Sequence, residues 1–188
     1  VYEDVFFKML NHLYEETKCE NLVLAGGCCL NSVANGKILS NTKFKNVWIQ
    51  PNATDGGTSI GAAYYLYNVI LGNERNFTLK NGALGPSFST EEIKNYLDLN
   101  NIKYDSIDDD KKLVKYVAEL LSSNHVVAWF QGKMEWGPRA LGNRSILANP
   151  CNQDAKELLN SKVKHREKFR PFAPVVCEDD ALKYFDCD

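Results

Sequence analysis

The stretch that decides the fold class is Asn21-Leu22-Val23-Leu24-Ala25-Gly26-Gly27, in which a short apolar run stops at two glycines. Such a run is typical of a buried strand that enters a tight turn. A second short strand is predicted at Val47-Trp48-Ile49, and the turn after it ends in Asp55-Gly56-Gly57. Two strands, each followed by a glycine turn and a helix, indicate an α/β fold.

The predicted helices have apolar residues spaced three or four positions apart, which places them on one face. Tyr2, Phe6, Met9 and Leu13 follow this spacing in a helix that ends near Lys18. Helices are also predicted at residues 31–40, after the second glycine turn, at 89–97 and around 113–121. The helix after the second glycine turn carries these apolar residues on one face: Ile60, Ala63, Tyr64, Tyr67 and Leu71. A further strand is predicted at 126–130, whereas turn formers fill residues 72–88 and indicate a domain junction.

Composition limits the classes of protein to consider. The 188 residues are 44% hydrophobic with a formal net charge of −2, which excludes disorder as the main state. No stretch reaches the roughly 18 apolar residues of a membrane span, and the chain begins at Val1 without a basic leader. We therefore expect no membrane partner, and we expect the chain to be a piece of a longer protein.

The six cysteines form neither a CxxC pair nor a zinc-ligand spacing. They are therefore predicted to be reduced thiols in a cytoplasmic protein. Cys28 and Cys29 lie in an apolar run and are predicted to be small core residues without a reactive role.

Charge is unevenly distributed along the chain. Residues 124–176 carry nine Lys or Arg against four Asp or Glu, a local net charge of +5. Residues 1–123 carry a net charge of −3, and the tail from Cys177 to Asp188 carries −4. A basic stretch inside an acidic chain favours a small anionic ligand over a nucleic-acid groove, because a nucleic-acid face usually makes the whole domain basic.

The two glycine turns have two interpretations. Glycine turns after strands expose backbone N–H groups that hold phosphate or carboxylate, but the same residues also form plain tight turns. Gly26-Gly27-Cys28-Cys29 is neither a dinucleotide fingerprint nor a P-loop. Asp55 likewise is a candidate ligand or a residue that caps a helix or forms an Asx turn.

Two clusters of cations follow the predicted strand at 126–130. In the first, residues 131–145, Arg139 and Arg144 lie among Gly, Pro, Ala and Leu, where unpaired charge is costly. The second covers residues 162–172 and by itself fits either a solvated helix end or an anion site. Planar guanidinium groups suit bidentate recognition of phosphate, so the two clusters together favour an anion pocket.

Four segments, in order, resemble the signatures of the O-carbamoyltransferases that act on antibiotics and nodulation factors. Leu24–Gly36 resembles their AGGxALNxxxNG segment, with Cys29 in place of the usual Ala. Asp55–Ala63 resembles their DGGxxxGAA turn. The C-terminal signatures are matched by EWGPRALGNRSILA at 135–148 and by FRPFAP at 169–174, with Lys168 where Pro is common.

The resemblance implies two domains. Residues 1–75 would be the C-terminal part of an actin/Hsp70-type ATPase-like domain, similar to the universal tRNA threonylcarbamoylation protein. Residues 76–88 would be a linker, and residues 89–188 a truncated YrdC-like α/β domain. In that family the YrdC-like domain makes carbamoyl-adenylate from carbamoyl phosphate and ATP. The ATPase-like domain then moves the carbamoyl group onto the hydroxyl of a small-molecule acceptor.

The resemblance also implies roles for individual residues. The residues implied to hold carbamoyl phosphate and the adenylate are Arg139, Arg144, Lys164 and Arg166, which would be catalytic, with Ser145 and Arg170. The residues implied to bind the nucleotide are Gly26, Gly27, Asn31, Gly56 and Gly57. Asp55 would be one ligand of a divalent metal such as iron. The family's metal-binding His pair lies upstream of these segments, and none of His12, His125 and His165 matches it.

Two other functions stay open. A tRNA threonylcarbamoyladenosine-type enzyme would need a strongly basic face, which the net charge of −3 over residues 1–123 does not favour, so no nucleic-acid partner is expected. A non-catalytic nucleotide-binding module would keep the glycine turns without needing both arginine clusters. The oligomeric state is also open, with a homodimer as one alternative.

Overall fold

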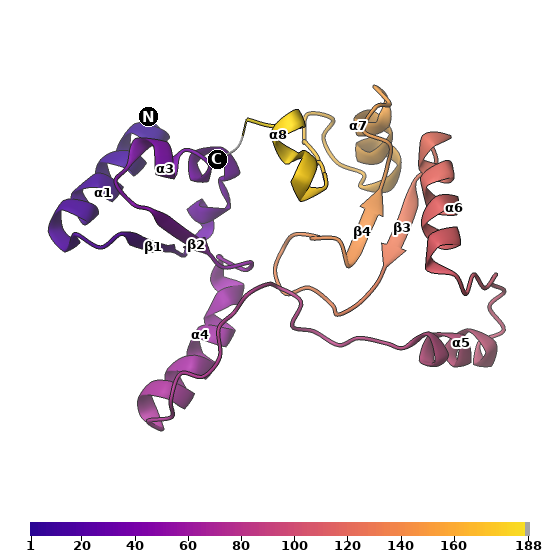
Figure 1. The fold of residues 1–188 in the computed structure, drawn as a ribbon, viewed down its shortest axis with the longest axis horizontal. Coiled ribbons are helices and arrows are strands. Elements are labelled where there is room, and N and C mark those ends of the chain that lie inside the picture. The colour runs from indigo at the N-terminus through magenta and orange to yellow at the C-terminus, as the bar shows by residue number, and fades with distance from the viewer. Residues whose placement is uncertain (187–188) are drawn as a thin grey trace. The chain divides into compact units, whose positions relative to one another are not determined.

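The computed structural model describes residues 1–186, which divide into two compact units (Figure 1). Unit 1 contains Val1–Gly85 together with Glu135–Ala140, and unit 2 contains Pro86–Met134 and the chain from Leu141 onward. The α/β class predicted from the sequence is confirmed, because each unit combines helices with a two-stranded sheet. The assignment to ATPase-like and YrdC-like domains stays a prediction.

Unit 1 is built on two parallel strands, β1 (Asn21–Leu24) and β2 (Asn46–Ile49), at the positions that the sequence predicts. Leu22 is aligned with Val47, and Leu24 with Ile49. Because the strands are parallel, the turns that follow them begin at the same edge of the sheet.

Helix α1 (Tyr2–Thr17) covers this small sheet, and its bounds agree with the prediction. The face that it buries is different from the expected one. Leu10 enters a core with Leu22, Ile38 and Phe44, while Phe6, Phe7 and Tyr14 pack at its margin. Tyr2, Met9 and Leu13 are 39%, 64% and 44% exposed, so the predicted stripe was wrong at these three positions. Apolar residues lie on more than one side of this helix, and contact with β1 selects the side that is buried.

The single helix predicted at residues 31–40 is two short helices, α2 (Ser32–Asn35) and α3 (Ile38–Asn41). Asn31 caps α2, because its side-chain oxygen accepts a hydrogen bond from the Ala34 N–H at 3.2 Å. The break falls at Gly36 and Lys37, and glycine is a poor residue for a helix interior. Ala34 and Ile38 are fully buried on either side of the break.

The helix after the second glycine turn begins as α4 (Thr58–Tyr64) and continues as a π-helical turn, η3 (Tyr65–Ile70). Its predicted apolar face is largely open to solvent in the described chain. Tyr67 is 48% exposed and Leu71 is 62% exposed.

Unit 2 begins with α5 (Thr90–Leu99) and α6 (Asp110–Ser122), close to the predicted bounds. Ser89 starts α5 with a capping box, since it exchanges hydrogen bonds with Glu92. Strand β3 (Val127–Phe130) follows as predicted and pairs antiparallel with β4 (Arg144–Leu147), which the sequence did not indicate. The remaining elements are α7 (Ala155–Leu158), the π-helical turn η4 (Leu159–Val163), η5 (Glu178–Asp180) and α8 (Ala181–Tyr184).

The prediction that Cys28 and Cys29 are both core residues is half wrong. Both lie in the short helical turn η1 (Gly27–Leu30), where Cys29 is buried and Cys28 is exposed. Within residues 1–186, none of the helices combines the length and the apolar character that a bilayer crossing requires.

Candidate functional site

The two glycine turns lie side by side at the carboxyl edge of the sheet in unit 1. The N–H of Gly26, after β1, donates a hydrogen bond to the carbonyl oxygen of Ala53, after β2, at 2.6 Å. The acceptor residue Ala53 is 2% exposed, whereas Gly26 is exposed. The turn at Gly26 and the turn η2 (Asp55–Gly57) therefore form one continuous backbone surface.

The glycines of the two turns are present for different reasons. A Cβ at Gly57 would lie 2.2 Å from Nε2 of Gln50 and 2.3 Å from the carbonyl oxygen of Asn52, and Gly56 is crowded by Asn52 as well. Gly26 has φ +109°, which L side chains rarely adopt. A Cβ at Gly27 would meet nothing within 4 Å, and its φ is not in the left-handed region. Packing therefore accounts for Gly56 and Gly57, whereas Gly27 leaves open space at the surface of the turn.

The polar residues beside the first turn have structural contacts. Asn31, predicted to contact nucleotide, uses its side-chain oxygen as the cap of α2. The side-chain nitrogen of Asn35 donates to the carbonyl oxygen of Cys29 at 2.7 Å and holds the turn from the helix side. Nucleotide contact by Asn31 stays a prediction, and it would have to involve another atom of this residue.

Asp55 is exposed at the start of the second turn. Its backbone carbonyl accepts a hydrogen bond from Oγ1 of Thr58 at 2.6 Å, and the residue at the N-cap of the turn is Thr54. No cap hydrogen bond to the Asp55 side chain is found in the described chain, so capping does not account for this carboxylate. Residues 1–186 contain no group of three His, Cys, Asp or Glu suited to hold a metal. The metal ligation implied for Asp55 stays a prediction.

The first cation cluster is divided between the units. Its segment Glu135–Ala140 belongs to unit 1, where the N–H of Trp136 donates to the carbonyl oxygen of Gly82 at 2.6 Å. Gly137 has φ +127°, and a Cβ there would lie 2.5 Å from the carbonyl oxygen of Pro51. Only glycine permits this approach. The segment therefore packs on the turn that precedes Asp55, and it places the exposed Arg139 in the unit that holds both glycine turns.

Arg144 lies on β4 in unit 2, and its guanidinium group is committed to the loop between β3 and β4. It donates hydrogen bonds to the carbonyl oxygens of Gln131 at 2.6 Å, Asn143 at 3.0 Å and Gly132 at 3.3 Å. Its central carbon lies 3.5 Å from the centroid of the Phe130 ring, a cation–π contact. These contacts indicate a structural role in the loop. The phosphate contact implied for Arg144 stays a prediction.

Ser145, the next residue on β4, also contacts this loop. Its hydroxyl oxygen accepts a hydrogen bond from the Gly142 N–H at 3.0 Å. Gly142 has φ +110°, so the turn into the strand requires glycine. The hydroxyl keeps its own proton for a further acceptor.

The second cation cluster forms an irregular loop in unit 2, which we call the basic loop (Lys164–Arg170). It follows η4, whose last turn is closed by the hydrogen bond from the Lys164 N–H to the carbonyl oxygen of Leu159 at 2.8 Å. His165 has φ +47°, an uncommon conformation that turns the chain back at the loop entrance.

The side chain of Arg166 is held by one hydrogen bond and one ring contact. Its Nε donates to Oδ1 of Asn160 at 2.8 Å, and its guanidinium carbon lies 4.7 Å from the centroid of the Phe172 ring. Among residues 1–186, its Nη1 and Nη2 groups have no hydrogen-bond partner. Arg166 therefore presents a fixed guanidinium plane with one edge open for two parallel hydrogen bonds to an oxyanion.

The other cations of the loop are paired with carboxylates or exposed. Nε of Arg170 lies 2.7 Å from Oε2 of Glu167, and Lys168 pairs with Glu157. The pKa of Glu167 is lowered, first by its own backbone N–H and then by Arg170. Lys164 is exposed, and its side chain has no ion pair with a described residue. Arg166 and Lys164 are thus the cations of this loop that form no ion pair with a described residue, although the charge of Arg166 also contributes to the lowered pKa of Glu167.

Sequence reasoning missed Asn160, the residue to which the basic loop is attached. Its side chain is fully buried and contacts three residues of the loop. No pattern in the sequence marks it, because only two leucines precede Asn160 and polar residues follow it.

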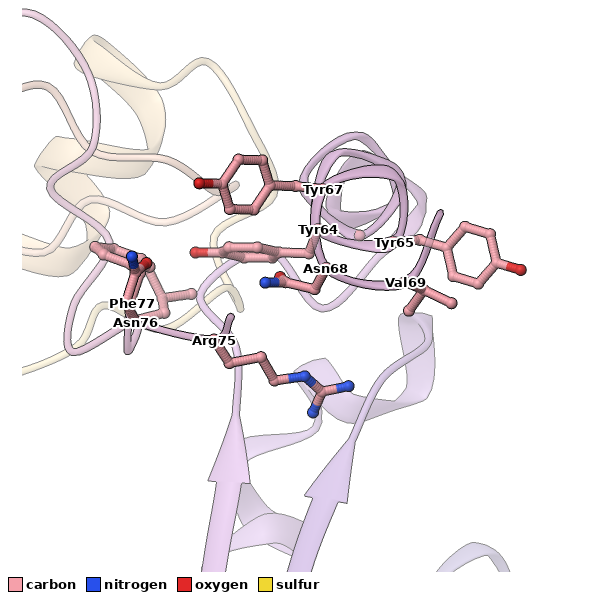
Figure 2. A pocket seen from close by; sticks show the side chains of 10 residues that line it. Tyr64, Tyr65, Tyr67, Asn68, Val69, Arg75, Asn76 and Phe77 are labelled. Carbon is pink, nitrogen blue, oxygen red and sulfur yellow. The ribbon is translucent and has the colours of Figure 1, made fainter. Parts of the chain in front are cut away.

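A cavity of about 480 Å³ lies elsewhere in unit 1, at the end of α4 and η3. Figure 2 shows Tyr64 and Tyr67 on the side of the helix that faces Phe77 and Asn76. The rings of Tyr64 and Phe77 are stacked, with centroids 6.1 Å apart. None of the predicted site residues lines this cavity.

Comparison with known families identifies the chain. Sequence models described as "Carbamoyltransferase N-terminus" and "Carbamoyltransferase C-terminus" match residues 1–64 and 118–188. The chain belongs to the carbamoyltransferase family. The first family match includes both glycine turns and Asp55, and the second includes every predicted cation from Arg139 to Arg170 as well as Asn160.

Three relatives of this chain show how much of a longer protein it corresponds to. "Uncharacterized protein sll1178" of Synechocystis is 46% identical over 100% of the chain and 31% of its own length. "Nodulation protein NolNO" of Sinorhizobium fredii is 37% identical over 98% of the chain and 27% of its own length. "Nodulation protein NolO" of Bradyrhizobium diazoefficiens is 36% identical, with 98% and 34% covered. The chain thus spans about a third of the length of these relatives.

Proposed function

We propose that the protein containing this chain transfers a carbamoyl group to a hydroxyl group of a small molecule. The donor is carbamoyl phosphate, from which water releases phosphate and leaves carbamate. An oxygen of carbamate then bonds to the α-phosphorus of ATP, and the bond from that phosphorus to pyrophosphate breaks to give carbamoyl-adenylate. When the acceptor oxygen bonds to the carbamoyl carbon, the bond from that carbon to the adenylate phosphate breaks and AMP leaves. The hydroxyl proton passes to a base or to water.

The observation that carries this proposal is the open edge of Arg166. The guanidinium plane is set by Asn160 and Phe172, while Nη1 and Nη2 remain available among the described residues. A fork held in this way suits the phosphate oxygens of carbamoyl phosphate, and its charge offsets the negative charge that grows on phosphate as the leaving group departs. Lys164, Arg170 and Ser145 in unit 2 are the further groups that we assign to this donor.

In unit 1, the joined glycine turns are the proposed site of the adenylate. The open space at Gly27 allows a ligand to approach the backbone closely, and N–H groups of such turns stabilise phosphate. Arg139 is in the same unit and supplies a cation there. A divalent metal held partly by Asp55 would polarise an oxygen of the transferred group.

The proposal includes the domain types. We assign residues 1–75 to an ATPase-like carbamoyl-transfer domain and residues 89–188 to a YrdC-like domain that forms the adenylate. The family matches at 1–64 and 118–188 support two separate parts with separate tasks.

The test is AMP and pyrophosphate formation by the full-length protein. Formation from ATP should require carbamoyl phosphate, and mass spectrometry should find an acceptor heavier by one carbamoyl group. Arg166→Lys keeps the charge and loses the fork, so the rate should fall by roughly one to three powers of ten. Arg170→Lys is the matched comparison, with a smaller effect, because Glu167 already offsets the charge of Arg170. AMP formation that is independent of carbamoyl phosphate would contradict the proposal.

A further inference from the structure

We propose that Asn160 is a positioning residue that holds the basic loop in its anion-binding conformation. This inference rests on the proposed function, because it concerns the same phosphate site. Asn160 contacts no ligand itself in this proposal. It acts through Arg166, whose guanidinium group it orients.

Asn160 is the one fully buried polar side chain in the described part of the chain, with 0% of its surface exposed. A buried amide without partners costs about 1–3 kcal/mol, so its presence requires hydrogen bonds that use its polar atoms. All of these atoms are used. Oδ1 accepts from Nε of Arg166 at 2.8 Å, and Nδ2 donates to the carbonyl oxygens of Arg170 at 2.9 Å and Lys168 at 3.3 Å.

These bonds fix the loop at every second residue. The backbone N–H of Arg166 also donates to the carbonyl oxygen of Asn160 at 2.9 Å, so both the main chain and the side chain of Arg166 are attached to one residue. The loop has no strand or helix of its own between Lys164 and Arg170. Its conformation therefore depends on Asn160 in place of a regular backbone ladder.

The arrangement requires an amide at this position. The loop presents a guanidinium donor and two carbonyl acceptors to the same side chain, and only Asn or Gln offers an acceptor and two donors together. Asn160 reaches these partners from the π-helical turn η4. An aspartate of the same shape would accept from Arg166 but could not donate to the two carbonyls.

A carboxylate at residue 160 would also attract the Nη1 and Nη2 groups of Arg166 toward itself. In the native structure only Nε is bonded to Asn160, which leaves Nη1 and Nη2 for the anion. A charged partner favours a bidentate pair with the guanidinium group, and that pair would compete with phosphate. Asn160→Asp should therefore weaken carbamoyl phosphate binding even where the protein remains folded.

The experiment compares Asn160→Asp, Asn160→Leu and the control Leu159→Ala in the full-length protein. Leu159 is adjacent and 6% exposed, so its truncation costs stability and leaves the hydrogen bonds of Asn160 in place. The KM for carbamoyl phosphate should rise at least about tenfold in both Asn160 variants and stay within about twofold in Leu159→Ala. The melting temperature of each variant is measured in parallel.

A double-mutant cycle with Arg166→Gln separates positioning from general destabilisation. If Asn160 acts through Arg166, Asn160→Asp should raise the KM for carbamoyl phosphate by less than about twofold in the Arg166→Gln background. Equal effects in both backgrounds, or an equal rise in KM for Leu159→Ala, would overturn the inference. A parent enzyme that forms no AMP with carbamoyl phosphate would contradict the proposed function instead, so the two failures are distinguishable.

Discussion

Replacing Arg144 with Gln should destabilise unit 2 and loosen the loop between β3 and β4. In the native structure one guanidinium group binds the carbonyl oxygens of Gln131, Gly132 and Asn143 and lies on the ring of Phe130. Phe130 and Arg144 are also aligned across the two strands. The side chain therefore joins both ends of the loop to its strand pair.

The expected loss follows from these contacts. A hydrogen bond contributes about 1 kcal/mol net, and a cation–π contact at an accessible site about 0.5–1 kcal/mol. Arg144 is only half-buried, so water replaces part of what the carbonyls lose. We expect the free energy of unfolding of unit 2 to fall by about 2 kcal/mol, less than the full sum of the contacts.

The assay is urea unfolding followed by the fluorescence of Trp129, together with hydrogen exchange of the loop amides at residues 131–143. Arg139→Gln is the control, because Arg139 is exposed in unit 1, and its unfolding free energy should change by less than about 0.5 kcal/mol. The reasoning is refuted if Arg144→Gln keeps its stability and amide protection but loses affinity for inorganic phosphate. In that case Arg144 binds the anion, as the family resemblance implies.

Three further predictions concern unit 1. Gly57→Ala should unfold the second turn and lower the melting temperature, since its Cβ would lie 2.3 Å from the backbone carbonyl oxygen of Asn52. Gly27→Ala should keep the melting temperature and weaken ATP binding measured by calorimetry, because a Cβ there meets nothing within 4 Å. Asp55→Asn should lower the metal content of the full-length protein by elemental analysis while adenylate formation survives, and an unchanged content would reject Asp55 as a ligand. The pKa of Glu15 is lowered from 4.5 to about 2, chiefly by its hydrogen bond with Lys18, so the stability from this pair is present above pH 4.5 and is lost as pH falls through 2. A carbon NMR titration should show that midpoint at low salt and a higher one in 1 M salt, while a low-salt midpoint at 4.5 would contradict the ion pair.

Local chemistry was sufficient for most elements. The apolar run at Asn21–Leu24 formed β1, the acidic first turn after Ser89 formed α5, and Val127–Phe130 formed β3. In each case the residues that define the element are close in sequence, so spacing and capping rules apply directly. The family resemblance likewise rested on four short motifs, each made of residues that are close in sequence. The family matches confirm the resemblance.

Features that depend on distant partners could not be predicted in this way. Arg144–Leu147 has an unremarkable sequence for a strand and becomes β4 because it pairs with β3. The single helix expected at 31–40 failed for a local reason, because it breaks at Gly36 and Lys37. Which side of α1 is buried was decided by contact with Leu22 and Phe44, since the helix carries apolar residues on more than one side.

The sequence by itself determined the α/β class, the family and the list of cations and glycines from which a site can be built. The tertiary structure decided how those residues are used. Gly26 is hydrogen-bonded to Ala53, and Arg139 lies in unit 1. The guanidinium group of Arg144 donates to backbone carbonyls, whereas Nη1 and Nη2 of Arg166 stay available beside Asn160. The physical reason is that composition and spacing report which donors and charges exist, whereas their availability depends on the hydrogen bonds that packing imposes on them.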